Sequence, residues 1–285
     1  MADLPTDADR PCDRLMSTAA QVWSYRTLIS NLVQRDLKSR YKRSVLGWSW
    51  SLINPLATLL VYSLVFGVIL RGVPPVAGNG ELQNYAIFLF CGLVAWNAFY
   101  NTYTAALNSL EDAGPLLTKV YFPPECPPIA GALSEVYQTA IEMLVLLGVM
   151  VIVGNLGATT LLAPLGLIAA SVFGLGLGMV AGLWNVRYRD VAYTSTIVLQ
   201  LLFYGTPIIY PRDIVPETAW GWLPLGRLID LNPMTHFVGV FRDLVYGLEL
   251  PSVASTAYAS FFMLGALALG WWTYASAAPR IIEEL

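Results

Sequence analysis

Residues 26–44 read RTLISNLVQRDLKSRYKRS, and residues 45–70 continue without a linker as VLGWSWSLINPLATLLVYSLVFGVIL. The first part combines many basic residues with regularly spaced apolar ones, which is typical of a helix that lies flat on a membrane surface. The second part is apolar and long enough to cross a bilayer, which requires about 20 residues. The stretch therefore predicts a membrane protein in which a cytoplasmic amphipathic helix, about 26–43, joins the first span directly.

The predicted amphipathic helix has two sides at 3.6 residues per turn. Its apolar side holds Leu28, Ile29, Leu32, Val33, Leu37 and Tyr41, and its polar side holds Asn31, Gln34, Arg35, Lys38 and Lys42. Asp36 and Arg40 fall within the apolar side, four residues apart, so we expect them to pair with each other. Two interpretations stay open: an anchor on anionic lipid, or a docking surface for a cytoplasmic partner.

The composition of the 285-residue chain indicates an integral membrane protein. Hydrophobic residues make up 56% and charged residues only 12%, which is more apolar surface than one soluble core of this size buries. The net charge of -3 argues against a nucleic-acid partner, because phosphate binding requires an excess of Lys and Arg. Three cysteines without CxxC spacing predict neither a disulfide framework nor a metal site. Residues 1–21 have no apolar run and are expected to form a disordered cytoplasmic tail, not a signal peptide.

Six segments are long and apolar enough to span a membrane. They are residues 46–70, 85–107, 129–153, 160–184, 191–210 and 253–274. Twelve of the sixteen Lys and Arg residues then lie on the side of the N-terminus, and the other four are Arg71, Arg212, Arg227 and Arg242. This asymmetry predicts cytoplasmic N- and C-termini. The predicted fold is an all-α integral membrane protein with one transmembrane domain, residues 22–285.

The connection between the last two predicted spans, residues 211–250, contains two apolar patches that are too short to span. Such patches are typical of re-entrant or interfacial helices, which are tolerated where protein or a water-filled cavity satisfies the backbone. We therefore expect a pair of short re-entrant helices on the outer side.

Four sequence motifs follow one another along the chain. The first motif comprises Arg35, Asp36, Lys38, Arg40, Tyr41, Ser44, Leu46, Gly47, Trp50 and Pro55. The others are KVYFPPECPP (119–128), GTPIIYP (205–211) and LNPMTHFVGVFRDLVYG (231–247). In order and spacing, the four motifs resemble the permease subunits of ABC-2-type exporters of polysaccharides, O-antigens and teichoic acids. The resemblance implies a six-span subunit that forms a channel with a second copy of itself, above two copies of a cytoplasmic ATPase. It also implies that the amphipathic helix is a gate helix and that the loop between spans two and three helps to couple the ATPase.

The sequence is consistent with a permease that relies on a separate ATPase. The chain has no GxxxxGK[ST] motif, so ATP and Mg are expected on the partner and no cofactor on this chain. The only histidine, His236, has no GxSxG serine beside it in the sequence, so we expect a permease and not an enzyme. The residues expected to couple the chain to the ATPase are Arg35, Asp36, Lys38, Arg40, Tyr41, Lys119 and Glu125.

Aromatic and arginine side chains are the candidates for contact with a lipid-linked glycan. Aromatic faces stack on the CH-rich faces of sugars, and the candidates for the channel are Trp50, Tyr62, Phe66, Phe88, Trp96 and Tyr100. Arg227 and Arg242 are the candidates for contact with the phosphate of a polyprenyl headgroup on the outer side. The expected location is the bacterial cytoplasmic (inner) membrane.

An alternative is a secondary transporter or flippase for a lipid-linked substrate, without an ATPase. Glu135 and Glu142 lie seven residues apart on one face of the third predicted span, and intramembrane carboxylates are typical of proton-coupled transport.

The fourth predicted span carries Gly174, Gly178 and Gly182 at four-residue spacing, which predicts close packing against a neighbouring helix.

Overall fold

The computed structural model describes residues 21–40, 42, 44–69, 72–117, 120 and 122–281, and its named elements are all helical. The main helices are α2 (Arg26–Arg40), α3 (Trp50–Tyr62), α4 (Tyr85–Leu117), α5 (Cys126–Ile152), α6 (Ala163–Arg187), α7 (Asp190–Tyr204), α8 (Leu225–Leu231), α9 (Pro233–Arg242) and α10 (Val253–Ile281). A π-helical segment, η3 (Ser63–Ile69), continues α3, and another, η6 (Asp243–Gly247), continues α9. The predicted tail up to residue 20, Tyr41 and Lys119 lie outside the described residues.

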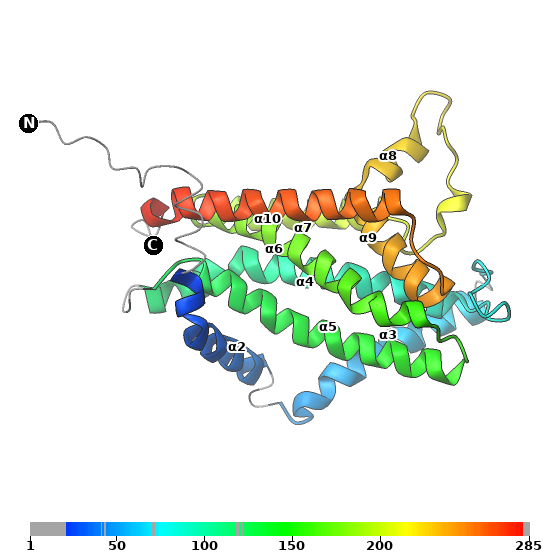
Figure 1. Ribbon diagram of the computed structural model, residues 1–285, viewed down its shortest axis with the longest axis horizontal. Helices are drawn as coiled ribbons and strands as arrows, with labels where there is room; N and C mark the ends of the chain where they lie inside the picture. Colours follow the sequence, from blue (N-terminus) through cyan, green and yellow to red (C-terminus); the bar gives the residue numbers. More distant parts are fainter. Residues whose placement is uncertain are drawn as a thin grey trace, which may run out of the picture.

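Helices α4, α5, α6 and α10 form the body of a bundle and run along its long axis (Figure 1). Helix α6 packs between α4 and α10. At Gly174, a Cβ would lie 2.4 Å from the backbone oxygen of Phe99, and at Gly178 it would lie 2.5 Å from that of Tyr103. The predicted close packing along this glycine row is confirmed, because no larger residue lets α6 lie so near α4.

Among the residues that the structure describes, four helical segments are long and apolar enough to span a membrane: Gly47–Ile69, Cys126–Ile152, Ala158–Arg187 and Val253–Ser276. They match the first, third, fourth and sixth predicted spans. Helix α4 is 33 residues long but carries several Asn, Thr and Tyr side chains.

The fifth predicted span is shorter than expected. Helix α7 has 15 residues and ends at Tyr204, whereas the prediction extended the helix to residue 210. Gly205 follows at once, and Pro207 disfavours helical geometry in the residue before it. A 15-residue helix rises only about 22 Å, which is less than the hydrocarbon thickness.

The connection between α7 and α10 contains the two short helices α8 and α9, one for each apolar patch, and Figure 1 shows α8 projecting at the end of the bundle opposite α2. Asn232 separates the two helices and caps α9, because its side chain accepts a hydrogen bond from the Met234 N–H at 3.0 Å. The Asn232 amide also donates to the backbone oxygen of Gly205 at 3.2 Å. This one residue therefore ties the α8–α9 pair to the end of α7.

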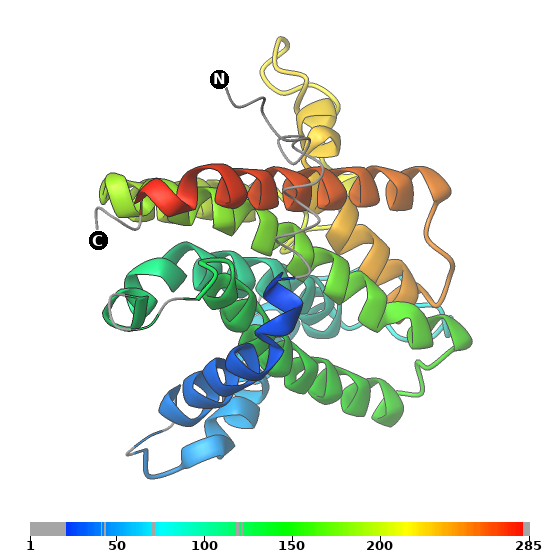
Figure 2. The ribbon, with the colours of Figure 1, turned by 60° about the vertical axis from the view of Figure 1, so that its left-hand side comes forward.

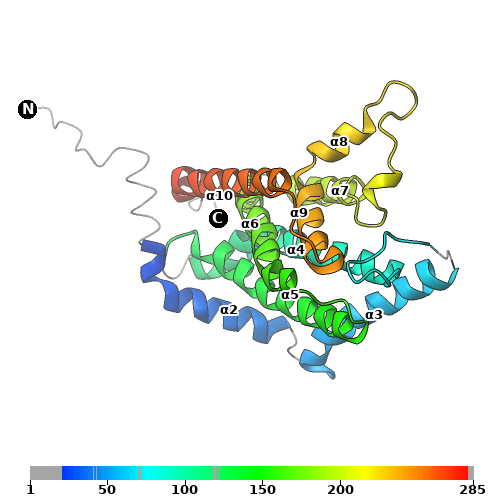
Figure 3. The same ribbon diagram turned by 45° about the vertical axis from the view of Figure 1, so that its right-hand side comes forward.

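Helices α2 and α3 both pack against α5, on one flank of the bundle (Figures 2 and 3). The first span is the least buried, since only 6% of its most apolar window lies inside the protein. Helix α2, in contrast, buries Ile29, Leu32 and Val33. The fold thus fixes the amphipathic helix on the bundle and leaves the first span exposed.

Candidate functional site

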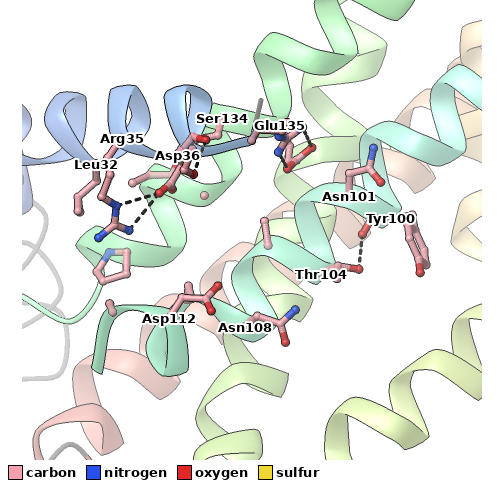
Figure 4. Close-up of a pocket in the computed structure, with 18 residues that line it drawn as sticks. Leu32, Arg35, Asp36, Tyr100, Asn101, Thr104, Asn108, Asp112, Ser134 and Glu135 are labelled. Atoms are coloured by element: carbon pink, nitrogen blue, oxygen red, sulfur yellow. Dashed lines mark hydrogen bonds and ion pairs between the residues drawn. The ribbon is translucent and has the colours of Figure 1, made fainter. Parts of the chain in front are cut away.

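A polar pocket of about 420 Å³ lies between α2, α4 and α5. We call it the α2 pocket. Figure 4 shows Arg35 and Asp36 of α2, Asn101, Asn108 and Asp112 of α4, and Ser134 and Glu135 of α5 around it. The pocket therefore joins the predicted gate helix to two long helices of the bundle.

The apolar side of α2 faces protein. Leu32 and Val33 form a small core with Phe122, Cys126 and Ala130, which come from the segment that leads into α5 and from α5 itself. Such burial, at roughly 25 cal/mol per Å² of apolar surface, fixes α2 on α5. The two-sided pattern found in the sequence is confirmed, and its apolar side is a packing surface within this chain.

Arg40 forms an ion pair with Glu135 of α5, while Asp36 pairs with its neighbour Arg35 at 3.0 Å. The predicted pairing of Asp36 with Arg40 is therefore wrong. Arg40 lies at the end of α2, where its long side chain reaches across to α5. The Arg40 side chain is 32% exposed and that of Glu135 only 12%, so this pair is partly shielded from water. It ties the end of α2 to α5.

Two acidic groups from different helices meet in the α2 pocket. Loss of water around its carboxyl group and then the nearby Asp36 carboxylate raise the pKa of Asp112, while Arg35 opposes this effect. The pocket thus carries a cluster of charges of both signs at the junction of α2 and the C-terminal end of α4.

The predicted coupling residues fall into different environments. Arg35 and Lys38 are exposed, and Asp36 and Arg40 line the α2 pocket. Glu125 is only 3% exposed and precedes the first turn of α5, so its carboxyl group is not on the surface that a partner would touch. Burial raises the pKa of Glu125.

A second polar pocket, of about 400 Å³, adjoins the first. We call it the amide pocket, and its lining is Arg40, Trp50, Asn54, Asn101, Glu135, Gln138 and Glu142. Arg40, Asn101 and Glu135 line both pockets. The carboxylate of Glu142 accepts a hydrogen bond from Asn97 at 3.0 Å.

Sequence reasoning identified Glu135 and Glu142 but missed the amides. The sequence contains a pattern that indicates these amides, because Asn97 and Asn101 are four residues apart on α4 and share one face. Polar residues at helical spacing within an apolar helix indicate a shared polar partner.

The six channel candidates do not share one environment. Phe88 and Trp96 are 4% and 5% exposed and belong to the main hydrophobic core, so they are packing residues in this subunit. Trp50 lines the amide pocket and Tyr100 lines the α2 pocket. Tyr62 and Phe66 are partly buried, with ring centroids 6.0 Å apart. The channel prediction stays open for these last four alone.

The two arginines predicted to contact a lipid phosphate also differ. Arg242 donates to the backbone oxygens of Phe88 (3.2 Å), Pro207 (2.5 Å) and Ile208 (2.6 Å), so its guanidinium is held inside the fold and not presented to a headgroup. Arg227 is exposed on α8, and its phosphate role stays a prediction. Asp230, three residues further along α8, pairs with Arg212 at 2.8 Å.

Comparison of the sequence with known proteins identifies a family. The model of the ABC-2 type transporter family matches residues 27–246. An O-antigen export system permease protein RfbA of Myxococcus xanthus is 29% identical over 232 residues, covering 81% of this chain and 85% of that protein. A Klebsiella pneumoniae protein of the same name is 28% identical over 219 residues, with 76% and 79% covered.

A more distant relative has a similar length. The polysialic acid transport protein KpsM of Escherichia coli is 22% identical over 252 residues, which cover 87% of this chain and 93% of that protein. The family match spans the amphipathic helix, both pockets and the α8–α9 pair. The chain belongs to the ABC-2 type transporter family.

Proposed function

We propose that this chain is the membrane-spanning permease subunit of an ATP-driven exporter that moves a lipid-linked polysaccharide out of the cytoplasm. The observation that carries the proposal is the family match from α2 through α9, together with relatives named as O-antigen export and polysialic acid transport proteins. The glycan is of the O-antigen, galactan or teichoic acid type, linked to a polyprenyl carrier.

ATP and Mg bind a separate ATPase in this proposal, because the chain has no phosphate-binding GxxxxGK[ST] motif. The exposed side of α2, with Arg35 and Lys38, supports docking of that ATPase. Two permease copies and two ATPase copies form the complex. The exposed face of the first span is the surface available for the second copy.

The chain spans the inner membrane six times, with both termini in the cytoplasm. Basic residues concentrated on the side of α2 support this orientation. It places α8 and α9 on the outer side, where they form a lid over the exit. Helix α7 is short for a span, and the segment that follows it completes the crossing inside the protein.

Coupling runs from α2 into the bundle. A push on α2 reaches α5 through the apolar contacts of Leu32 and Val33 and through the Arg40–Glu135 pair. Helix α5 in turn packs along α4, so a displacement of α2 moves the walls of both polar pockets.

Depletion of the permease tests the proposal. We expect surface glycan to fall while the lipid-linked glycan accumulates inside the cell, and the permease to co-purify with an ATPase. Unchanged surface glycan after depletion would contradict an export role.

A second candidate is a proton-coupled secondary transporter, because Glu142 is 6% exposed and lies near Glu135 in the amide pocket. A variant of the partner ATPase that cannot hydrolyse ATP separates the two functions. ATP-driven export stops in that strain, whereas proton-coupled export continues and stops with a protonophore.

A further inference from the structure

We propose that the amide pocket is a binding subsite for an uncharged sugar unit of the transported glycan. The proposal rests on the proposed function, because it assumes that the substrate is a glycan. It adds a place on the chain where the sugar is recognised and the chemistry that recognises it.

Helical spacing brings the polar groups to one place. Trp50 and Asn54 are four residues apart at the start of α3, and Glu135, Gln138 and Glu142 follow one another at three- and four-residue steps along α5. Residues at these steps share one face of a helix. With Asn101 of α4, three helices thus present amide and carboxyl groups to one cavity.

Two of these amides are available to a ligand. Within the described residues, the side chains of Asn54 and Asn101 make no hydrogen bond to protein, although both line the pocket. Asn101 faces the space between α4 and α5 in Figure 4. Unpaired amides are costly in a membrane unless water or a ligand satisfies them.

The chemistry of the lining fits a sugar. Each amide offers a donor and an acceptor side by side, which matches neighbouring hydroxyl groups of a pyranose ring. The Trp50 side chain is 46% exposed and offers a flat apolar face to the C–H groups of the same ring. A volume of about 400 Å³ lies within the usual range of small-molecule sites.

The charge of the lining disfavours an anionic ligand. The one cation, Arg40, already pairs with Glu135, and Glu142 adds a further carboxyl group. A phosphate or pyrophosphate headgroup requires free cations, usually Arg or Lys, and would be repelled here. The pocket therefore recognises the glycan and not the lipid phosphate.

Photo-crosslinking in the full complex tests contact directly. Asn54 is replaced by p-benzoyl-phenylalanine in cells whose partner ATPase cannot hydrolyse ATP, so that substrate stays engaged. Leu144 of α5, which is 66% exposed and lines neither polar pocket, is the matched control position. We expect a periodate-positive glycan adduct at position 54 and none at position 144.

Export kinetics give the second measurement. In proteoliposomes containing the complex and lipid-linked glycan from permease-depleted cells, Asn101→Leu should raise the half-saturating substrate concentration about three- to tenfold, the loss of one or two hydrogen bonds. Asn101→Gln should recover part of the affinity, and Leu144→Ala should match the wild type.

Three results would overturn the proposal: no glycan adduct at position 54, an adduct with sugar-free polyprenyl phosphate, or equal half-saturation in Asn101→Leu and the wild type. Failure of the proposed function is distinguishable, because depletion would then leave surface glycan unchanged. If only the subsite proposal is wrong, export still depends on the permease, but these variants behave as the wild type.

Discussion

Arg242 and Gly92 form a packed contact between the end of α9 and the N-terminal part of α4, and Gly92→Ala should break it. The Arg242 guanidinium donates to three backbone oxygens and lies 3.8 Å from the ring centroid of Phe88. Gly92 is one turn after Phe88 on α4, and a Cβ there would lie 2.4 Å from the Arg242 Nη2 atom. The alanine methyl group and the guanidinium cannot both keep their places.

The size of the effect follows from the bonds at risk. A hydrogen bond from a charged donor contributes about 1.5–3 kcal/mol, and the displaced Nη2 loses its bond to Ile208 and strains those to Phe88 and Pro207. Replacing a helical glycine by alanine returns roughly 0.5–1 kcal/mol. The net expectation is a loss of about 2–4 kcal/mol in the free energy of unfolding.

Equilibrium unfolding in mixed micelles with increasing SDS measures this loss. Gly148→Ala in helix α5 is the control, because a Cβ there meets nothing within 4 Å, and it should be neutral or slightly stabilising. In an Arg242→Met background the added methyl group no longer meets the guanidinium, so Gly92→Ala should then cost less than about 1 kcal/mol. Equal penalties in both backgrounds would refute the contact as the cause.

Three further outcomes are expected. Arg40→Glu should destabilise the permease by about 1–2 kcal/mol, and Glu135→Arg in the same chain should restore part of it; no recovery in the double variant would count against the ion pair. Burial and then Glu249 raise the pKa of Asp243 to about 6, above its unfolded value of about 3.9, so stability should fall as pH rises from 4 to 6, by less than the full shift implies because water screens this half-buried group. Asp243→Asn should flatten that dependence, and an unchanged slope would exclude this group. A cysteine at exposed Glu81 should react with an impermeant maleimide in intact cells, and the reverse orientation would leave it protected.

Hydrophobic periodicity was sufficient to locate the helices and the packed side of α2. Each predicted span coincides with a helix because a run of about 20 apolar residues has few other stable states in a membrane. The end of α7 was placed too far because the apolar residues 207–209 continue the hydropathy signal, whereas helix geometry stops where Gly205 and Pro207 intervene. Hydropathy does not register that backbone restriction.

The details of the site depended on contacts that no local pattern contains. Four-residue spacing favoured a pair between Asp36 and Arg40, but Glu135, 95 residues further along the chain, supplies the partner. The aromatic residues of α4 were equally ambiguous, since the helix is apolar on most sides and gives a weak indication of which face is core. Packing against α6 and α9 decides that Phe88 and Trp96 point inward.

The two polar pockets are coupled by geometry, since Arg40, Asn101 and Glu135 line both. Movement of α2 away from α5 must separate Arg40 from Glu135, and it thereby removes one wall of the amide pocket. It also exposes the Glu135 carboxylate to water, since that side chain is only 12% exposed while the ion pair is formed. A partly buried charge that loses its partner is unfavourable, so the ion pair stabilises the arrangement in which α2 lies on α5. A partner that displaces α2 must supply this energy, and in doing so it changes the shape of the site where we propose that a sugar binds. The Arg40–Glu135 pair that holds α2 on α5 therefore also sets the shape of the proposed sugar site.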